Sequence, residues 1–305
     1  MIPLFIKDEA SVGGLSLMIS GLYFQKGIKI SHLRSRISRA RRQATQNLTW
    51  ATCFDNLASD VSNLDALFIS IDFENPDKIA SCAKSGLLDD SPYVSVGISI
   101  LDTRDLHNAR LPASRVVGKT YNICVGNNKI RKQWQDRRFL FGKTIWIPKL
   151  KYMKPSIELA IDRSRNIIFV GQAFDIELKV LRELGVDLKT SVVGTIDTYK
   201  LDEANTKEVP LGGNRSLKGI LARLGLPVEC CHIGGNDANY TLRAMLLLTA
   251  EGFSRSKEEM TDAEVERVSR LRAIALSPIA HVGAVPPSPP ASGSESDGES
   301  ESEEE

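Results

Sequence analysis

A short apolar stretch that ends in two acids constrains this chain most. Residues 67–76 read L-F-I-S-I-D-F-E-N-P, a run of β-branched and aromatic residues before an Asn-Pro turn, which predicts a buried strand. Asp72 and Glu74 lie two positions apart, so their side chains share one face of such a strand. Two carboxylates on one face repel each other and are costly to bury, unless a divalent cation lies between them. The alternative is a solvated strand end that holds no ion.

The cysteines indicate a reducing compartment. Their number is odd and none forms a C-x-x-C pair, which argues against a disulfide framework and a structural zinc site (Cys53, Cys82, Cys124, Cys230 and Cys231). We therefore expect a cytoplasmic or nuclear location. No apolar run reaches membrane-spanning length, and the apolar stretch 13–24 lacks the features of a signal peptide, so we expect no membrane partner.

The formal net charge of +1 conceals an asymmetry between the body and the tail of the chain. Residues 283–305 contain seven acids and no lysine or arginine, so setting those seven charges aside leaves +8 on residues 1–282. A basic body favours an anionic partner, with nucleic acid as the first candidate. The Pro-rich and Ser/Glu-rich tail has the composition of a disordered segment and is a candidate site for a protein partner.

Two basic segments could contact such a partner. No acid occurs between Glu9 and Asp55, and residues 26–42 contain seven lysines and arginines, partly within a predicted helix at 31–46. A second basic run, residues 129–138, encloses Trp134, as expected for a phosphate track with a base-stacking platform. A disordered arm and a solvated loop anchored by one tryptophan are the respective alternatives.

The order of the predicted elements indicates an α/β fold. Five strands are predicted, at 67–74, 93–101, 120–125, 166–171 and 192–199. Helices are predicted at 155–164, 174–184, 217–224, 236–251 and from a capping box at Thr261 to about Leu276. The segment between the first two strands reads as an elaborated hairpin, and most of 103–155 as irregular. We therefore expect a mixed five-stranded sheet flanked by helices, antiparallel first and parallel later.

Three further polar residues lie at strand ends or helix starts, where α/β folds gather their chemistry. Asp175 follows the strand 166–171, and His232 and Asp237 form an H-x4-D spacing before the long helix. Each residue also has an ordinary structural interpretation. Asp175 could answer a helix dipole, Asp237 could cap a helix, and His232 could be a surface histidine.

Taken together, the series Ile71-Asp72-Phe73-Glu74, Phe174-Asp175 and His232-x4-Asp237 resembles the DEDDh exonucleases of the RNase H-like superfamily. Within them, Phe139-Leu-Phe-Gly142 and the run from His232 to Leu242 are similar to a fungal family of DEDDh-like proteins linked to messenger RNA export and RNA silencing. The chain departs from many members at Gly171-Gln172-Ala173, where those carry a His-Asn pair.

The resemblance implies an RNase H-like fold and a two-metal 3′–5′ exonuclease that releases nucleoside 5′-monophosphates from the 3′ end of RNA or single-stranded DNA. It implies that Asp72, Glu74, Asp175 and Asp237 bind two Mg²⁺ or Mn²⁺ ions and that His232 is the general base. For Phe73, contact with the terminal base and packing in the core are equal alternatives.

The expected organisation has four parts: a basic N-terminal extension (1–62), the exonuclease domain (63–255), a C-terminal helix (256–280) and a disordered acidic tail (281–305). Two other functions stay open. One is a catalytically weak nucleic-acid-binding or adaptor protein in messenger RNA export or silencing. The other is a hydrolase of small phosphoesters, which the long basic segments make less suitable.

Overall fold

The computed structural model describes residues 66–279, apart from 107, 109, 117–118 and 207–214. The predicted N-terminal extension, its helix at 31–46 and the predicted acidic tail lie outside the described residues. No helix of the described part is both long and apolar enough to span a bilayer.

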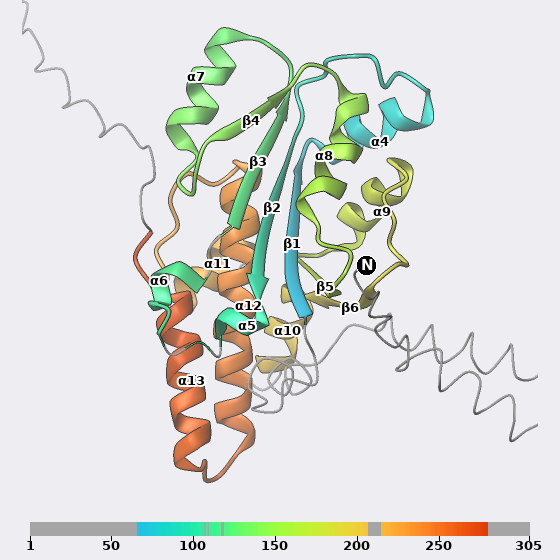
Figure 1. The fold of residues 1–305 in the computed structure, drawn as a ribbon. Coiled ribbons are helices and arrows are strands. Elements are labelled where there is room, and N and C mark those ends of the chain that lie inside the picture. Colours follow the sequence, from blue (N-terminus) through green and yellow to red (C-terminus); the bar gives the residue numbers. More distant parts are fainter. Residues whose placement is uncertain (1–65, 107, 109, 117–118, 207–214, 280–305) are drawn as a thin grey trace, which may run out of the picture.

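A mixed sheet forms the centre of the described chain (Figure 1). Its strands are β1 (Ala66–Glu74), β2 (Ser95–Asp102), β3 (Lys119–Val125), β4 (Thr144–Ile147), β5 (Asn166–Gly171) and β6 (Val192–Asp197). They lie in the order β4-β3-β2-β1-β5-β6. The pairs β1/β2 and β2/β3 are antiparallel, and the pairs β3/β4, β1/β5 and β5/β6 are parallel.

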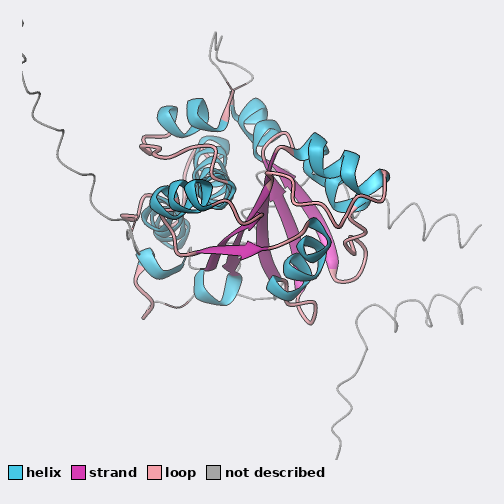
Figure 2. Ribbon diagram, turned by 90° about the horizontal axis from the view of Figure 1, so that it is seen from above, coloured by secondary structure: helices cyan, strands magenta, loops and turns pink. Residues whose placement is uncertain are grey.

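Helices cover both faces of this sheet, as the view from above in Figure 2 shows. They are α4 (Pro76–Lys84), α5 (Thr103–Leu106), α6 (Ala113–Val116), α7 (Lys129–Arg138), α8 (Met153–Ala160), α9 (Asp175–Glu183), α10 (Thr198–Asn205), α11 (Leu217–Arg223), α12 (Gly234–Ser256) and α13 (Asp262–Ala275), with a 3₁₀ turn η1 (Leu150–Tyr152). One hydrophobic core holds side chains of α4, α8 and α9, and the other those of α10 to α13.

The predicted α/β fold with a mixed sheet between helices is confirmed, with one more strand than expected. The additional strand, β4, has only four residues and pairs at the edge with β3. It lies in the segment that we interpreted as irregular, as does α7. The predicted hairpin connection between β1 and β2 contains α4, which begins at Pro76.

The C-terminal helix follows its predicted start closely. Thr261 Oγ1 accepts a hydrogen bond from the Glu264 N–H, and the Glu264 side chain accepts one from the Thr261 N–H, which is a capping box. Helix α13 then packs its buried residues, among them Leu271, into the same core as α12. The segment expected as a separate C-terminal helix is therefore part of this core.

Candidate active site

Strand β1 carries its two acids on the face that helix α12 covers. Ala66 and Phe68 pack in the core on the α12 side, whereas Ile71 and Phe73 pack in the other core. Because side chains alternate along a strand, the even-numbered Asp72 and Glu74 lie on the α12 face. Phe73 is only 5% exposed and packs in the other core, and its contact with a terminal base stays a prediction.

Glycines let helix α12 approach the strands closely. A Cβ atom on Gly97, which pairs with Asp72 in the sheet, would lie 1.8 Å from the carbonyl oxygen of Gly234. A Cβ atom on Gly235 would lie 2.6 Å from the ring of Phe139. Atoms that are not bonded to each other do not approach so closely, so a Cβ atom at either position would clash and glycine is required. The start of α12 therefore lies directly against the backbone of β2 and brings Asp237 towards β1.

Asn236 fixes the first turn of α12. Its Oδ1 accepts a hydrogen bond from the Leu140 N–H (3.0 Å), and its Nδ2 donates to the carbonyl oxygens of Arg138 (2.8 Å) and Cys230 (2.9 Å). The residue is completely buried, so these bonds satisfy an amide that would otherwise be costly to enclose. The role of Asn236 here is to connect three segments beside Asp237.

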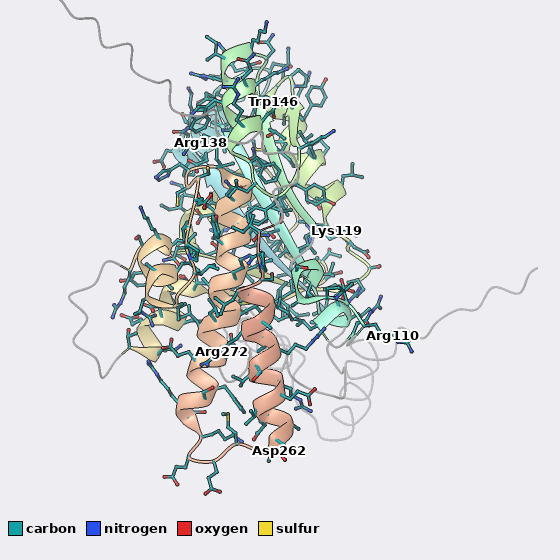
Figure 3. The ribbon with its side chains drawn as sticks, turned by 90° about the vertical axis from the view of Figure 1, so that its left-hand side faces the viewer. Arg110, Lys119, Arg138, Trp146, Asp262 and Arg272 are labelled. Atoms are coloured by element: carbon teal, nitrogen blue, oxygen red, sulfur yellow. The ribbon has the colours of Figure 1, made fainter. Side chains whose placement is uncertain are left out.

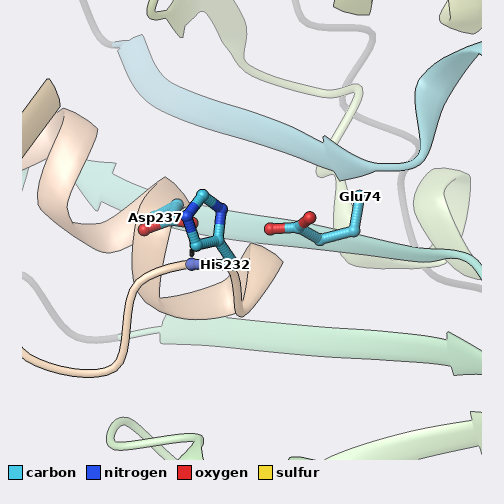
Figure 4. A group of neighbouring side chains, drawn as sticks. All are labelled: Glu74, His232 and Asp237. Carbon is cyan, nitrogen blue, oxygen red and sulfur yellow. Dashed lines mark hydrogen bonds between the residues drawn. The ribbon is translucent and has the colours of Figure 1, made fainter. Parts of the chain in front are cut away.

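Glu74, His232 and Asp237 converge at this point (Figure 4). One potential ligand atom from each residue lies within 4.8 Å of the other two. The His232 N–H donates a hydrogen bond to Asp237 Oδ2 at 2.8 Å. His232 is exposed and has a φ of 62°, a left-handed conformation that is unusual for a residue other than glycine. The turn therefore holds the imidazole beside the carboxylates at some conformational cost.

Asp72 lies in the negative field of its neighbours. Burial raises the pKa of its carboxyl well above the usual value, and the charges of Asp237, Glu74 and Glu177 raise it further. Within the described part of the chain, no lysine or arginine forms an ion pair with any of these four carboxylates. Within the described residues, no lysine or arginine paired with them therefore offsets the repulsion between these carboxylates.

Asp237 and Glu74 are shifted in the same direction. Burial raises the pKa of Asp237 to about 7, against the hydrogen bond from the His232 N–H, which lowers it. Burial also raises the pKa of Glu74, and the charge of His232 partly opposes this. Protonation of these carboxyls would remove part of the repulsion between them, and a bound cation would remove more of it.

The structure does not bring Asp175 into this group. Asp175 is exposed at the start of α9, whereas Glu177, one half-turn later, is half-buried. Glu177 is among the charges that act on Asp72, and its Oε2 is buried without a hydrogen-bond partner. Burial raises the pKa of Glu177 to about 7. Sequence analysis missed this residue.

A signal for Glu177 exists in the sequence. Phe174, Leu178 and Leu181 form the apolar stripe of α9, and position 177 lies within that stripe by helical spacing. An acid on the core-facing stripe of an amphipathic helix needs an explanation, whereas Asp175 lies outside the stripe. Glu177 is thus a half-buried acid on the stripe of α9 that faces the other core, and its charge acts on Asp72.

This set of groups is suited to hard divalent cations. Carboxylate oxygens are the ligands that Mg²⁺ and Mn²⁺ prefer, and ion binding would remove the repulsion described above. The exposed imidazole of His232 lies beside two of these carboxylates. The residues therefore fit the metal-assisted hydrolysis implied by the sequence motifs.

A protein family, a curated protein and a solved structure are similar to this chain. A family model described as "DNA polymerase III subunit epsilon-like, C-terminal domain", of the DEDDh type, matches residues 67–248. An uncharacterized nucleolar protein of Schizosaccharomyces pombe is 30% identical over 115 residues, which cover 36% of this chain and 46% of that protein. The match thus spans just under half the length of that relative.

Among solved structures, the RNase domain of the yeast Pop2 protein matches with a TM-score of 0.33 and 12% identity, over 70% of this chain and 88% of that one. The family match covers more than half of the sequence and includes every acid and the histidine of the site. This chain belongs to the DEDDh exonuclease family of the RNase H-like superfamily.

Proposed function

We propose that the protein is a divalent-metal-dependent 3′–5′ exonuclease that acts on RNA or single-stranded DNA and releases nucleoside 5′-monophosphates. The observation that carries the proposal is the convergence of Glu74, His232 and Asp237, with the buried Asp72 close enough for the charges of Glu74 and Asp237 to raise its pKa. Family membership supports hydrolysis of a phosphodiester as the reaction.

In this proposal Asp72, Glu74, Asp237 and Glu177 hold two Mg²⁺ or Mn²⁺ ions. When bound, such ions supply a hydroxide nucleophile and stabilise the charge on the leaving oxygen. Asp72 is buried, its pKa is raised by the charges of the other three acids, and it would be one of the ligands. Glu177 takes the place that the motif comparison gave to Asp175, because its side chain is directed inwards and that of Asp175 is exposed.

His232 would accept the proton of the attacking water. Its imidazole is exposed to solvent and lies beside Glu74 and Asp237, where water bound between the carboxylates can reach it. Removal of a positioned general base lowers rates by about 10²- to 10⁴-fold. We therefore expect His232→Ala to lower kcat within that range while the protein still binds metal.

The test is digestion of oligonucleotides labelled at either end, with Mg²⁺ or Mn²⁺ and then with EDTA. Stepwise shortening from the 3′ end that EDTA and Asp72→Asn abolish is the expected result. Tight, salt-sensitive binding without cleavage in either metal would contradict it and favour the alternative, a binding or adaptor protein.

Glu177→Gln and Asp175→Asn form a matched pair for the fourth acid. Each removes one negative charge from the same turn of α9. Glu177→Gln should lower kcat at least about 100-fold, the loss expected for a group that stabilises charge in the transition state. Asp175→Asn should stay within a few-fold of the original protein. The reverse pattern would return the assignment to Asp175.

A further inference from the structure

Hydrophobic packing does not explain how helix α7 is held against the rest of the protein. Within its ten residues only Gln135 is buried, and the helix has no apolar face. Gln135 anchors it by hydrogen bonds, accepting from Asn122 Nδ2 (3.0 Å) and donating to the Tyr93 hydroxyl (3.1 Å). The remaining side chains of α7 are exposed or half-buried, so core packing does not determine which residues occupy these positions.

The surface of α7 carries a strong positive charge beside exposed aromatic rings. We define the α7 basic face by its cations and its tryptophan: Lys129, Arg131, Lys132, Trp134, Arg137 and Arg138. Asp136 is the only acid of the helix. Trp134 is 41% exposed, and the Arg138 guanidinium lies 4.9 Å from its ring centroid. Lys132 lies over the ring of Trp146 on the adjoining strand β4.

The α7 basic face is connected to the site at two points. The carbonyl of Arg138, the last residue of α7, accepts a hydrogen bond from Asn236, the residue before Asp237. Arg131 stacks on Tyr93, whose carbonyl accepts a hydrogen bond from Asn75, the residue after Glu74. Figure 1 shows α7 at the same end of the sheet as the start of α12. A polymer that enters the site therefore passes close to α7.

We propose that the α7 basic face binds the single strand whose 3′ end occupies the site, with Trp134 as a stacking platform for one base. The inference rests on the proposed function, because the polymer must enter the site. Arginine and lysine neutralise phosphates, and aromatic rings stack on bases of any sequence. An anionic membrane is less suitable, because a helix that lies in a bilayer surface needs an apolar face and α7 has none.

The test measures binding without cleavage, using the full chain in EDTA and a fluorescent single-stranded oligonucleotide at several salt concentrations. In the variant Lys129→Gln/Arg137→Gln, neither altered side chain makes a hydrogen bond or ion pair within the described residues. Binding should weaken about tenfold at moderate salt, and the salt slope should fall by about 1.4, because each phosphate contact on a single strand contributes about 0.7. Trp134→Ala should weaken binding at least about 5-fold.

The matched control is Lys189→Gln/Arg272→Gln, which removes two exposed charges elsewhere. Figure 3 shows Arg272 on α13, away from the labelled Arg138 and Trp146. This control should bind like the original protein. If the α7 variants bind the strand unchanged, or lose only binding to anionic vesicles, the proposal is wrong.

Because these measurements need no hydrolysis, an inactive but binding-competent protein would contradict the proposed exonuclease and leave the α7 proposal standing. Conversely, unchanged binding in the α7 variants together with intact cleavage would contradict only the α7 proposal.

Discussion

The protein treats buried acids in two opposite ways. Asp202 on α10 is 1% exposed, and two arginines, Arg223 and Arg215, form ion pairs with it. Asp237 on α12 is 8% exposed and receives only one backbone N–H, from His232, while the charge of Glu74 repels it. Two arginines therefore balance the charge of Asp202, whereas the charge of Asp237 lies beside that of Glu74.

The same contrast occurs within α12. Arg243 lies less than two turns after Asp237 and is 2% exposed. It donates to Asn239 Oδ1 and to the carbonyl oxygens of Ala275 and Ser277. Buried charge without such partners costs several kcal/mol, so chains keep it only where it serves another purpose. The difference is what the proposed cation site requires, since a bound cation would supply the positive charge that the fold gives Asp202 through arginines.

The largest effect expected from this contrast concerns Asp72. Asp72→Asn should lower kcat/KM by about 10³-fold or more, because it removes a ligand and its charge from the reacting centre. At neutral pH in EDTA the same variant should unfold at an equal or higher temperature than the original protein, because one of the four repelling charges is gone. Substantial loss of stability together with near-normal activity would contradict the role of Asp72 and the contrast between the paired Asp202 and the acids of the candidate site.

The second prediction concerns the ion itself. Mg²⁺ or Mn²⁺ at about 100 times its Kd should raise the free energy of unfolding by about 2.7 kcal/mol. Differential scanning calorimetry with and without metal measures this, and Asp237→Asn should abolish most of the gain. An unchanged Tm at high metal concentration would mean that the acids do not form a cation site.

The third prediction concerns the compensated acid. Arg223→Met should destabilise the protein by about 2 kcal/mol in urea unfolding, because it removes one of two cationic partners of a buried acid whose second partner, Arg215, remains. Arg223 is itself partly exposed, so the loss stays below that of a fully buried pair. The folded variant should retain its exonuclease activity. A gain in stability would show that Asp202 does not depend on this pair.

The fourth prediction concerns the dependence of stability on pH in EDTA. The pKa of Asp237 and that of Glu177 are raised from ordinary values near 4 to about 7, so the folded protein binds more protons than the unfolded chain between those limits. Stability should therefore fall as the pH rises from about 4 to about 7 and level off above. Thermal unfolding across that range should show a shallower slope for Asp237→Asn, and an equal slope would contradict the assignment.

Most of the fold follows from local patterns in the sequence, and so do the elements that carry the candidate site residues. Asp72 and Glu74 share a strand face by alternation, and His232 and Asp237 flank a helix start marked by glycines. The resemblance of the motifs favoured Asp175, although the apolar stripe of α9 already distinguishes Glu177 from it. The role of Phe73 could not be decided from the sequence, because an aromatic residue suits a core and contact with a base equally well.

The elements that escaped prediction are those that packing alone does not stabilise. Strand β4 has four residues and little periodicity. Helix α7 is a run of charged residues whose cap, Asn128, accepts a hydrogen bond from the Arg131 N–H and whose anchor is the single Gln135. Such an element depends on hydrogen bonds with residues distant in sequence, and hydrophobic periodicity does not record these.

The contact between Gly97 and Gly234 has a consequence for how activity can be lost. Since backbone atoms alone separate α12 from β2 there, the spacing of Asp237 from β1 cannot be restored by a change of rotamer. A descendant of this chain with alanine at Gly97 would keep all its acids, its histidine and its hydrophobic core, yet hold its carboxylates too far apart to share an ion. In such a lineage the substitution of a glycine would account for the loss of catalysis, and all the acids that give the family its name would still be present.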